Sequence, residues 1–110
     1  LKKSGEIDMA VSLQVLYPVG EGTTFDYDYY LGQHMAIVGD VMGEHIESTL
    51  VTKGLAGGPG APAGYHAIAT IVFSNQSAMD AALANAGPAL EDIPNFTNVQ
   101  PQMLIGEVVG

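Results

Sequence analysis

The chain contains no cysteine among its 110 residues. This absence excludes disulfides, thiolate metal sites and thiol redox chemistry, so the fold depends on packing alone, and we expect a protein of the reducing cytoplasm. No apolar run approaches the roughly 18 residues of a membrane-spanning helix, and residues 1–8 lack the apolar centre of a signal peptide. We therefore expect no membrane partner.

Positive charge is also scarce. The formal net charge is −9, no arginine is present, and Lys53 is the one cation after residue 8. Nucleic acids and phosphate-bearing cofactors are usually recognised through Lys and Arg, so we expect no nucleic-acid partner and no cofactor. The composition favours a neutral or apolar organic ligand, and the acidic residues are interpreted as a solvated surface.

The length and a hydrophobic content of 47% predict one domain over residues 9–110 with a modest core. A core of this size leaves apolar surface that self-association would bury. Residues 1–8 are interpreted as a polar leader left from recombinant expression, with Met9 as the native start.

Apolar periodicity predicts a strand over Met9–Tyr17, followed by a helix capped by Thr23 or Thr24 and ending near Gly43. The helix has apolar or aromatic side chains at spacings of four and three. These predict a buried stripe formed by Tyr27, Leu31, His34, Val38 and Val41.

The second half repeats this order of elements. Strands are predicted over Ile46–Lys53, Tyr65–Phe73 and Val99–Val109, with a helix after Ser74 or Asn75 and a further helical turn from Pro88. The order β-α-β-β-α-β predicts an α+β, ferredoxin-like fold, in which helices cover one face of a four-stranded antiparallel sheet. The glycine- and proline-rich segment 54–64 lacks a phosphate-loop pattern and is interpreted as a flexible lid.

Several segments resemble the EthD-like family: Tyr17-Pro18, Phe25-Asp26, Tyr29-Tyr30-Leu31-Gly32-Gln33-His34, and the stretch 92–101 that reads Asp-Ile-Pro-Asn-Phe-Thr-Asn-Val-Gln-Pro. The resemblance implies a homodimeric α+β barrel, in which two subunits meet through their open sheet faces, and an apolar ligand cavity between helix and sheet. It also implies an association with ether degradation. The family commonly has proline two positions after the histidine, where this chain has Ala36, so the helix is expected to continue past His34 with less of a kink.

Tyr30 and His34 form the main candidate site, because residues four apart on a helix are neighbours on one face. Histidine exchanges protons near neutral pH, and a nearby phenol can hold its tautomer or bind a carbonyl oxygen. The alternative is a packing pair in which the imidazole bonds to the backbone. Both interpretations stay open on the sequence alone.

Other polar candidates have a simpler alternative as well. Asp26 could extend the pair by one helical turn or could only interact with the helix dipole. His66 could face the barrel between subunits, with Ser12, Gln14 and Thr70, or could be an ordinary surface residue. His45 lies in an acidic turn, and the spacing of the three histidines predicts no metal site.

We therefore predict a pocket for a small, largely uncharged organic molecule, with His34 as general acid and base and Tyr30 polarising the substrate. The rest of the pocket lining is predicted to consist of Tyr17, Phe25, Asp26, His66 and Phe96. The alternative is a binding or accessory protein that uses the same pocket without catalysis.

Overall fold

The computed structural model describes residues 9–110, and the predicted leader 1–8 lies outside this part. The chain forms the predicted order of strands and helices. The strands are β1 (Val11–Pro18), β2 (Ser48–Lys53), β3 (Tyr65–Phe73) and β4 (Gln102–Glu107). The main helices are α1 (Tyr27–Tyr29), which continues through a π-helical segment (Tyr30–His34) into α2 (Met35–Met42), then α3 (Gln76–Ala84) and α4 (Gly87–Asp92). Short 3-10 turns follow α2 (Gly43–His45) and α4 (Ile93–Asn95).

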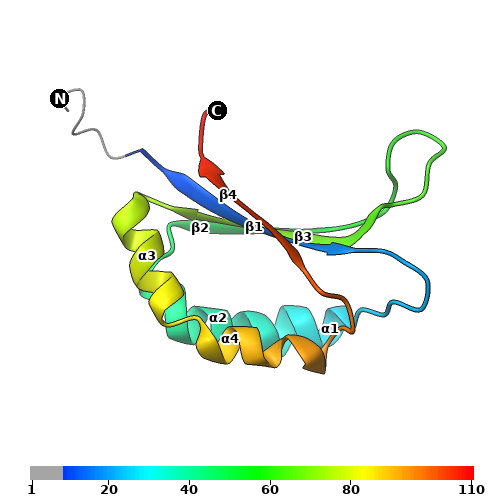
Figure 1. The fold of residues 1–110 in the computed structure, drawn as a ribbon, viewed down its shortest axis with the longest axis horizontal. Helices are drawn as coiled ribbons and strands as arrows, with labels where there is room; N and C mark the ends of the chain where they lie inside the picture. Colours follow the sequence, from blue (N-terminus) through cyan, green and yellow to red (C-terminus); the bar gives the residue numbers. More distant parts are fainter. Residues whose placement is uncertain (1–8) are drawn as a thin grey trace.

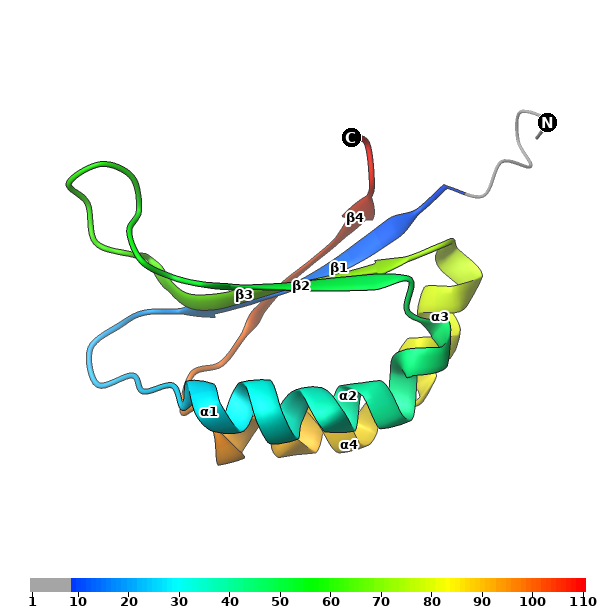
Figure 2. The ribbon, with the colours of Figure 1, turned by 180° about the vertical axis from the view of Figure 1, so that it is seen from behind.

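The four strands form one antiparallel sheet in the order β2-β3-β1-β4. All helices lie on the same face of this sheet, as Figure 1 and the reverse view in Figure 2 show. The predicted α+β, ferredoxin-like fold is confirmed. Within residues 9–110, no helix has both the length and the apolar character needed to cross a lipid bilayer.

The core lies between the helices and one face of the sheet. Alternate residues of β3 point into it, and Ala67, Ala69, Ile71 and Phe73 are all buried. The helix that packs over them begins at Asn75, whose side chain accepts a hydrogen bond from the Ala78 amide, as the sequence predicted. The predicted helical start near Pro88 and the helix end at Gly43 are also found.

The first helix differs from the prediction at its start. Asp26, rather than Thr23 or Thr24, is its N-cap, and the Asp26 carboxylate accepts a hydrogen bond from the Tyr29 amide at 3.0 Å. Thr23 instead bonds to Gly20 and His66 in the loop after β1, and the Thr24 amide donates to Asn98. Both threonines therefore fix the loop rather than the helix.

The predicted buried stripe of this helix is wrong at Leu31, which is 58% exposed, and its two end residues, Tyr27 and Val41, are only partly buried. The Met35 amide bonds to the Tyr30 carbonyl, which gives the wider turn of a π-helix. This turn takes up one extra residue and shifts the phase of the helix. The buried residues are therefore spaced by four throughout, at Tyr30, His34, Val38 and Met42.

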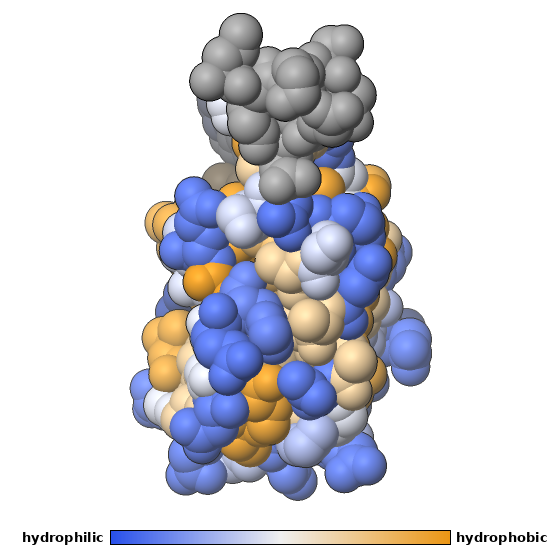
Figure 3. Space-filling model, turned by 90° about the vertical axis from the view of Figure 1, so that its left-hand side faces the viewer, coloured by the Kyte–Doolittle hydropathy of each residue, from blue (hydrophilic) through white to orange (hydrophobic). Residues whose placement is uncertain are grey.

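The opposite face of the sheet has no helix over it (Figure 2). It carries exposed apolar side chains. Leu50 on β2 is 64% exposed and Leu104 on β4 is 58% exposed. Gln14 donates a hydrogen bond to Thr70 on this face, as their predicted shared orientation requires. At the end of the molecule that carries α3, apolar surface is interrupted by hydrophilic side chains (Figure 3).

The loop 54–64 projects from the end of the sheet, away from the helices (Figures 1 and 2). Gly54 is required at its base, because a Cβ atom there would lie 1.9 Å from the Tyr65 carbonyl oxygen. No residue of this loop lines the cavity under the helices. The loop therefore does not cover this cavity within the chain, and its interpretation as a flexible lid stays a prediction.

Candidate functional site

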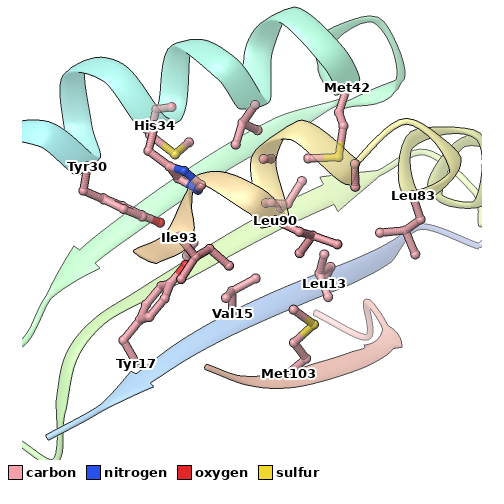
Figure 4. Close-up of a pocket in the computed structure, with 16 residues that line it drawn as sticks. Leu13, Val15, Tyr17, Tyr30, His34, Met42, Leu83, Leu90, Ile93 and Met103 are labelled. Atoms are coloured by element: carbon pink, nitrogen blue, oxygen red, sulfur yellow. The ribbon is translucent and has the colours of Figure 1, made fainter. Parts of the chain in front are cut away.

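A cavity of about 240 Å³ lies between the helices and the sheet (Figure 4). Its walls come from β1, β3, β4, the first helix and the segment from α3 to the turn after α4. The lining residues are Leu13, Val15, Tyr17, Tyr30, His34, Met35, Val38, Met42, Ala69, Ile71, Leu83, Ala86, Ala89, Leu90, Ile93 and Met103.

Small side chains leave this space open. Ala69 projects from β3, while Ala86 and Ala89 lie at the start of α4, and all three are buried. Interiors of proteins are otherwise close-packed, so an alanine on each of two facing layers leaves a volume that a larger side chain would fill. The cavity opens between α4 and the edge strand β4, where Leu90 is 50% and Met103 51% exposed.

Three polar side chains enter an otherwise apolar lining. The phenols of Tyr17 and Tyr30 and the imidazole of His34 point into the cavity (Figure 4). Tyr17 and Tyr30 are almost fully buried, yet neither hydroxyl has a hydrogen-bond partner within residues 9–110, and neither is sealed from the cavity. Both hydroxyls are thus free to donate to a ligand.

Both phenols stay neutral over the physiological pH range. Burial raises the pKa of Tyr30 from 10.0 to about 12. Burial, with a smaller contribution from Tyr30, raises the pKa of Tyr17 further. They therefore act as hydrogen-bond donors and not as bases.

His34 is held by Asp92. The Nδ1 atom of His34 lies 3.0 Å from Oδ2 of Asp92, and both side chains are buried. The other Asp92 oxygen accepts hydrogen bonds from the Tyr29 hydroxyl at 2.6 Å and the Asn95 amide at 3.0 Å. The carboxylate thus has a partner for each of its oxygen atoms.

The ionised carboxylate of Asp92 determines the tautomer of His34. Burial favours the neutral acid, but the hydrogen bonds from Tyr29, Asn95 and His34 outweigh it and hold the pKa of Asp92 below its usual range. An ionised carboxylate accepts from Nδ1–H, so we assign the neutral imidazole a proton on Nδ1 and a lone pair on Nε2. Nε2 is then the atom available to accept a proton from a ligand.

Tyr30 and His34 are brought together as predicted, but they do not bond to each other. Their rings stack with centroids 5.2 Å apart and an interplanar angle of 20°. The interpretation in which a phenol holds the imidazole tautomer is therefore wrong, because Asp92 has that role. The alternative in which the imidazole bonds to the backbone is wrong for the same reason.

Tyr17 lines the cavity, whereas Phe25 and Phe96 lie behind it. Phe96 packs against His34 with ring centroids 4.6 Å apart and against Tyr30 at 4.9 Å. Phe25 packs against Tyr17 at 5.2 Å. The two phenylalanines therefore orient the polar residues without lining the cavity.

Asp26 and His66 lie outside the cavity lining. Asp26 caps the first helix, so the predicted chain from Asp26 through Tyr30 to His34 does not form. His66 does not face the open side of the sheet, because a bulge leaves it without a partner residue opposite Tyr17 and Pro18. Its ring stacks on Phe25 at 5.8 Å, and its Nε2 lies 3.0 Å from the Thr23 hydroxyl.

Metal binding gains no support from the described residues. Residues 9–110 contain no group of three or more His, Cys, Asp or Glu side chains that could hold a metal ion. His45 lies 3.5 Å from an exposed Glu44 carboxylate, in the acidic turn that the sequence indicated.

Residues 20–100 match the EthD domain. The chain belongs to the EthD domain family. An EthD-like protein from Ralstonia eutropha JMP134 has a solved structure with 34% identity and a TM-score of 0.85, covering 94% of this chain and 95% of its own. No curated protein matches the chain.

Two more distant structures share the fold of this EthD domain. An EthD family protein from Bacillus halodurans C-125 is 18% identical with a TM-score of 0.72, covering 92% of this chain and 100% of its own. A dimeric ferredoxin-like protein from Thermobifida fusca YX is 10% identical with a TM-score of 0.62, covering 92% of each chain. The predicted family is confirmed by the matched domain and by the structure with 34% identity.

Sequence reasoning did not identify Asp92 as the partner of His34, or Tyr29 and Asn95 as the partners of Asp92, in this EthD domain. A signal for Asp92 is present, because Ala86, Ala89 and Asp92 recur at a spacing of three along the face that proves buried. A carboxylate on such a face is rarely buried without partners. The spacing therefore pointed to a paired acid, although not to its partner.

Proposed function

We propose that this EthD domain protein binds a small, uncharged organic molecule in the cavity and exchanges a proton with it through His34. The observation that carries the proposal is the buried His34–Asp92 pair, at 3.0 Å, beside two Tyr hydroxyls that have no partner within residues 9–110. Such an arrangement combines a base with hydrogen-bond donors in an apolar site.

The chemistry follows from the two kinds of polar group. Nε2 of His34 takes a proton from a carbon next to a ligand carbonyl, and the C–H electron pair forms the carbon–carbon double bond of an enolate. The carbonyl π electrons move to the oxygen, which accepts hydrogen bonds from Tyr17 and Tyr30. Asp92 stabilises the imidazolium that results, and return of the proton regenerates the ligand and the base.

The cavity selects against charged ligands. No Lys, Arg, Asp or Glu side chain lines it, and every lining residue other than Tyr17, Tyr30 and His34 is apolar. Burying an unpaired charge in such a site costs on the order of several kcal/mol. A carboxylate, phosphate or ammonium compound is therefore disfavoured.

An ether oxygen could accept a hydrogen bond from a Tyr hydroxyl, but an ether supplies no acidic proton to His34. Ketones and phenols supply both an oxygen and an exchangeable proton. A role in catabolism of an organic compound thus favours a carbonyl or phenol over the ether itself. Location in the cytoplasm stays a prediction based on the lack of cysteine.

We also propose that the protein is a homodimer that buries the helix-free face of the sheet. Leu50 and Leu104 are more than half exposed there, and Leu16, Ile68 and Val72 are only partly covered. Exposed apolar surface of this kind is typical of interfaces. The dimeric ferredoxin-like protein of Thermobifida fusca shares the fold, which is consistent with such an assembly.

The test is proton exchange on a ketone probe. We expect the protein to accelerate deuterium uptake at the carbons flanking the carbonyl of cyclohexanone in D₂O, measured by NMR. His34→Gln should lower this rate by about 10²-fold or more, the usual contribution of a general base, while keeping the fold. His45→Gln, the same change at a histidine of the acidic turn that does not line the cavity, serves as the control.

The same assay separates catalysis from binding alone. If calorimetry detects ketone binding while the exchange rate equals that in buffer, the protein is a binding or accessory protein. If neither cyclohexanone nor a phenol binds, the proposed site is wrong.

A further inference from the structure

The cavity has one polar end and one apolar end. Tyr17, Val15 and Leu13 line it from alternate positions of β1, so it follows the strand over about 13 Å. Tyr30 and His34 lie near the Tyr17 end, whereas Leu83 and Met42 lie toward the Leu13 end (Figure 4).

The apolar end has no group that could satisfy a polar atom. Its side chains are Leu13, Met42, Leu83 and Ala86, and the small Ala86 is 4% exposed. A hydroxyl or carbonyl placed there would lose its hydrogen bonds to water without a replacement from these side chains. The two ends therefore require different parts of one ligand.

The apolar end can also adapt to the shape of a ligand. Met35, Met42 and Met103 all line the cavity, and methionine side chains are flexible and polarizable. A tail of variable shape can therefore be accommodated, whereas the polar end is fixed by the Asp92–His34 hydrogen bond and by the stacking of His34 on Tyr30.

We propose that the ligand is a neutral amphiphile with a single polar head and an apolar tail. The head, a phenol or an enolisable carbonyl, lies among Tyr17, Tyr30 and His34, and the tail runs along β1 toward Leu13 and Met42. This inference rests on the proposed function, because it assigns the head to the same three polar groups. It adds a direction and a tail site that the proposed chemistry alone does not require.

The probes are 4-alkylphenols from 4-ethylphenol to 4-pentylphenol, with binding measured by calorimetry on the full protein. Each added methylene should raise the affinity about fourfold, because burying one is worth about 0.8 kcal/mol. A terminal hydroxyl on the pentyl chain should lower the affinity at least about tenfold relative to 4-pentylphenol, because the hydroxyl would be buried without a partner.

Two substitutions test where the tail lies. Ala86→Leu fills the apolar end directly, and Leu83→Trp narrows it from a position that is 38% exposed and tolerates a larger side chain. Each substitution should lower the affinity for 4-pentylphenol by about tenfold or more and change the affinity for 4-ethylphenol by less than about twofold. Leu31→Trp, at an exposed site outside the cavity, should change neither affinity.

Failure of the tail site and failure of the head site give different results. An affinity independent of chain length, or an equal loss for the short and long phenols in Ala86→Leu and Leu83→Trp, overturns the tail assignment and leaves the proposed function intact. Alkylbenzenes that bind as tightly as the matching alkylphenols would overturn the head assignment and, with it, the proposed function. Absence of binding by every probe would overturn both.

Discussion

The Nδ1 atom of His34 and the Oδ2 atom of Asp92 lie 3.0 Å apart, although 58 residues separate them in the chain. His34 ends the π-helical turn and Asp92 ends α4, so the contact joins two helices that lie side by side over the sheet. It also fixes which imidazole nitrogen is free to act on a ligand.

Asp92→Asn should change the tautomer of His34 and reduce proton exchange. An amide can donate to Nδ1, which moves the imidazole proton to Nε2 and removes the lone pair from the cavity. We expect an exchange rate on cyclohexanone lower by about 10²-fold. Nitrogen-15 NMR of the histidine ring measures the tautomer directly, and an unchanged tautomer would show that Asp92 does not control His34.

The same variant should alter stability in acid. The pKa of Asp92 in the fold lies below its ordinary value of 3.8, so its contribution to stability is present above pH 3.8 and is lost as the pH falls through the folded-state pKa. Asp92→Asn should therefore show a weaker loss of stability on acidification, measured by urea unfolding between pH 6 and about 2. An identical acid profile for both proteins would contradict this assignment.

Tyr30→Phe should protect the fold at alkaline pH. The unfolded chain ionises near pH 10.0 and the folded phenol near about 12, so stability is complete below pH 10.0 and falls as the pH rises between these values. A shift of this size corresponds to about 3 kcal/mol once both pKa values are passed, and about 2 kcal/mol of this is reached at pH 11.5. The free energy of unfolding of Tyr30→Phe should therefore fall by about 2 kcal/mol less than that of the parent at this pH. At pH 7 the variant should be nearly as stable as the parent, because its hydroxyl has no partner within residues 9–110.

Unfolding in urea at pH 7, 10 and 11.5 tests this prediction. Tyr65→Phe is the matched control, because Tyr65 lies outside the cavity and its hydroxyl makes an exposed contact with Gln102. It should keep the alkaline loss seen in the parent. In binding assays with 4-ethylphenol, Tyr30→Phe should lower affinity by about 0.5 to 1.5 kcal/mol through one lost hydrogen bond.

Val72→Asp should dissociate the proposed dimer. Val72 lies on the helix-free face opposite Ser48, and a carboxylate there would be buried without a partner when two such faces meet. We expect the dimer dissociation constant to rise by at least about 10²-fold in analytical ultracentrifugation. Leu31→Glu, at an exposed helix position, should leave it unchanged. A parent protein that sediments as a folded monomer at micromolar concentration would contradict the dimer itself.

Shortening the loop 54–64 by three residues should change stability little. Loop-closure entropy varies slowly with length, and glycine and proline offer few side-chain contacts. Removing Gly58, Pro59 and Gly60 keeps Gly54, whose close approach to Tyr65 requires glycine. We expect the melting temperature to fall by less than about 4 °C, roughly 1 kcal/mol. A larger fall would show that the loop packs against the rest of the protein.

The order of elements could be predicted because it depends on local signals. Strand alternation in Tyr65–Phe73, the Asn75 cap and Pro88 at a helix start each act over a few residues. Tyr17, Tyr30 and His34 could also be identified as candidates, since aromatic and histidine side chains on buried faces are distinctive.

The rest of the site depends on features that a regular periodicity cannot describe. The π-helical turn shifts Leu31 to the surface, and the bulge in β3 turns His66 toward Phe25. The partner of His34 comes from a segment 58 residues away, so its identity is a property of packing between helices and not of any local pattern. The same holds for the cavity, which Ala69 on β3 creates together with Ala86 and Ala89 at the start of α4.

The π-helical turn at Tyr30–His34 makes the sequence spacing of the site residues depend on how many residues the turn contains. Loss of one exposed residue, such as Leu31, would let the helix close into regular α-helical turns. Because the wide turn accommodates one extra residue, its loss would leave Tyr30 and His34 on nearly the same face, three residues apart instead of four. A relative with one residue fewer in this turn would therefore keep the geometry of the site while losing the sequence spacing that marks it here.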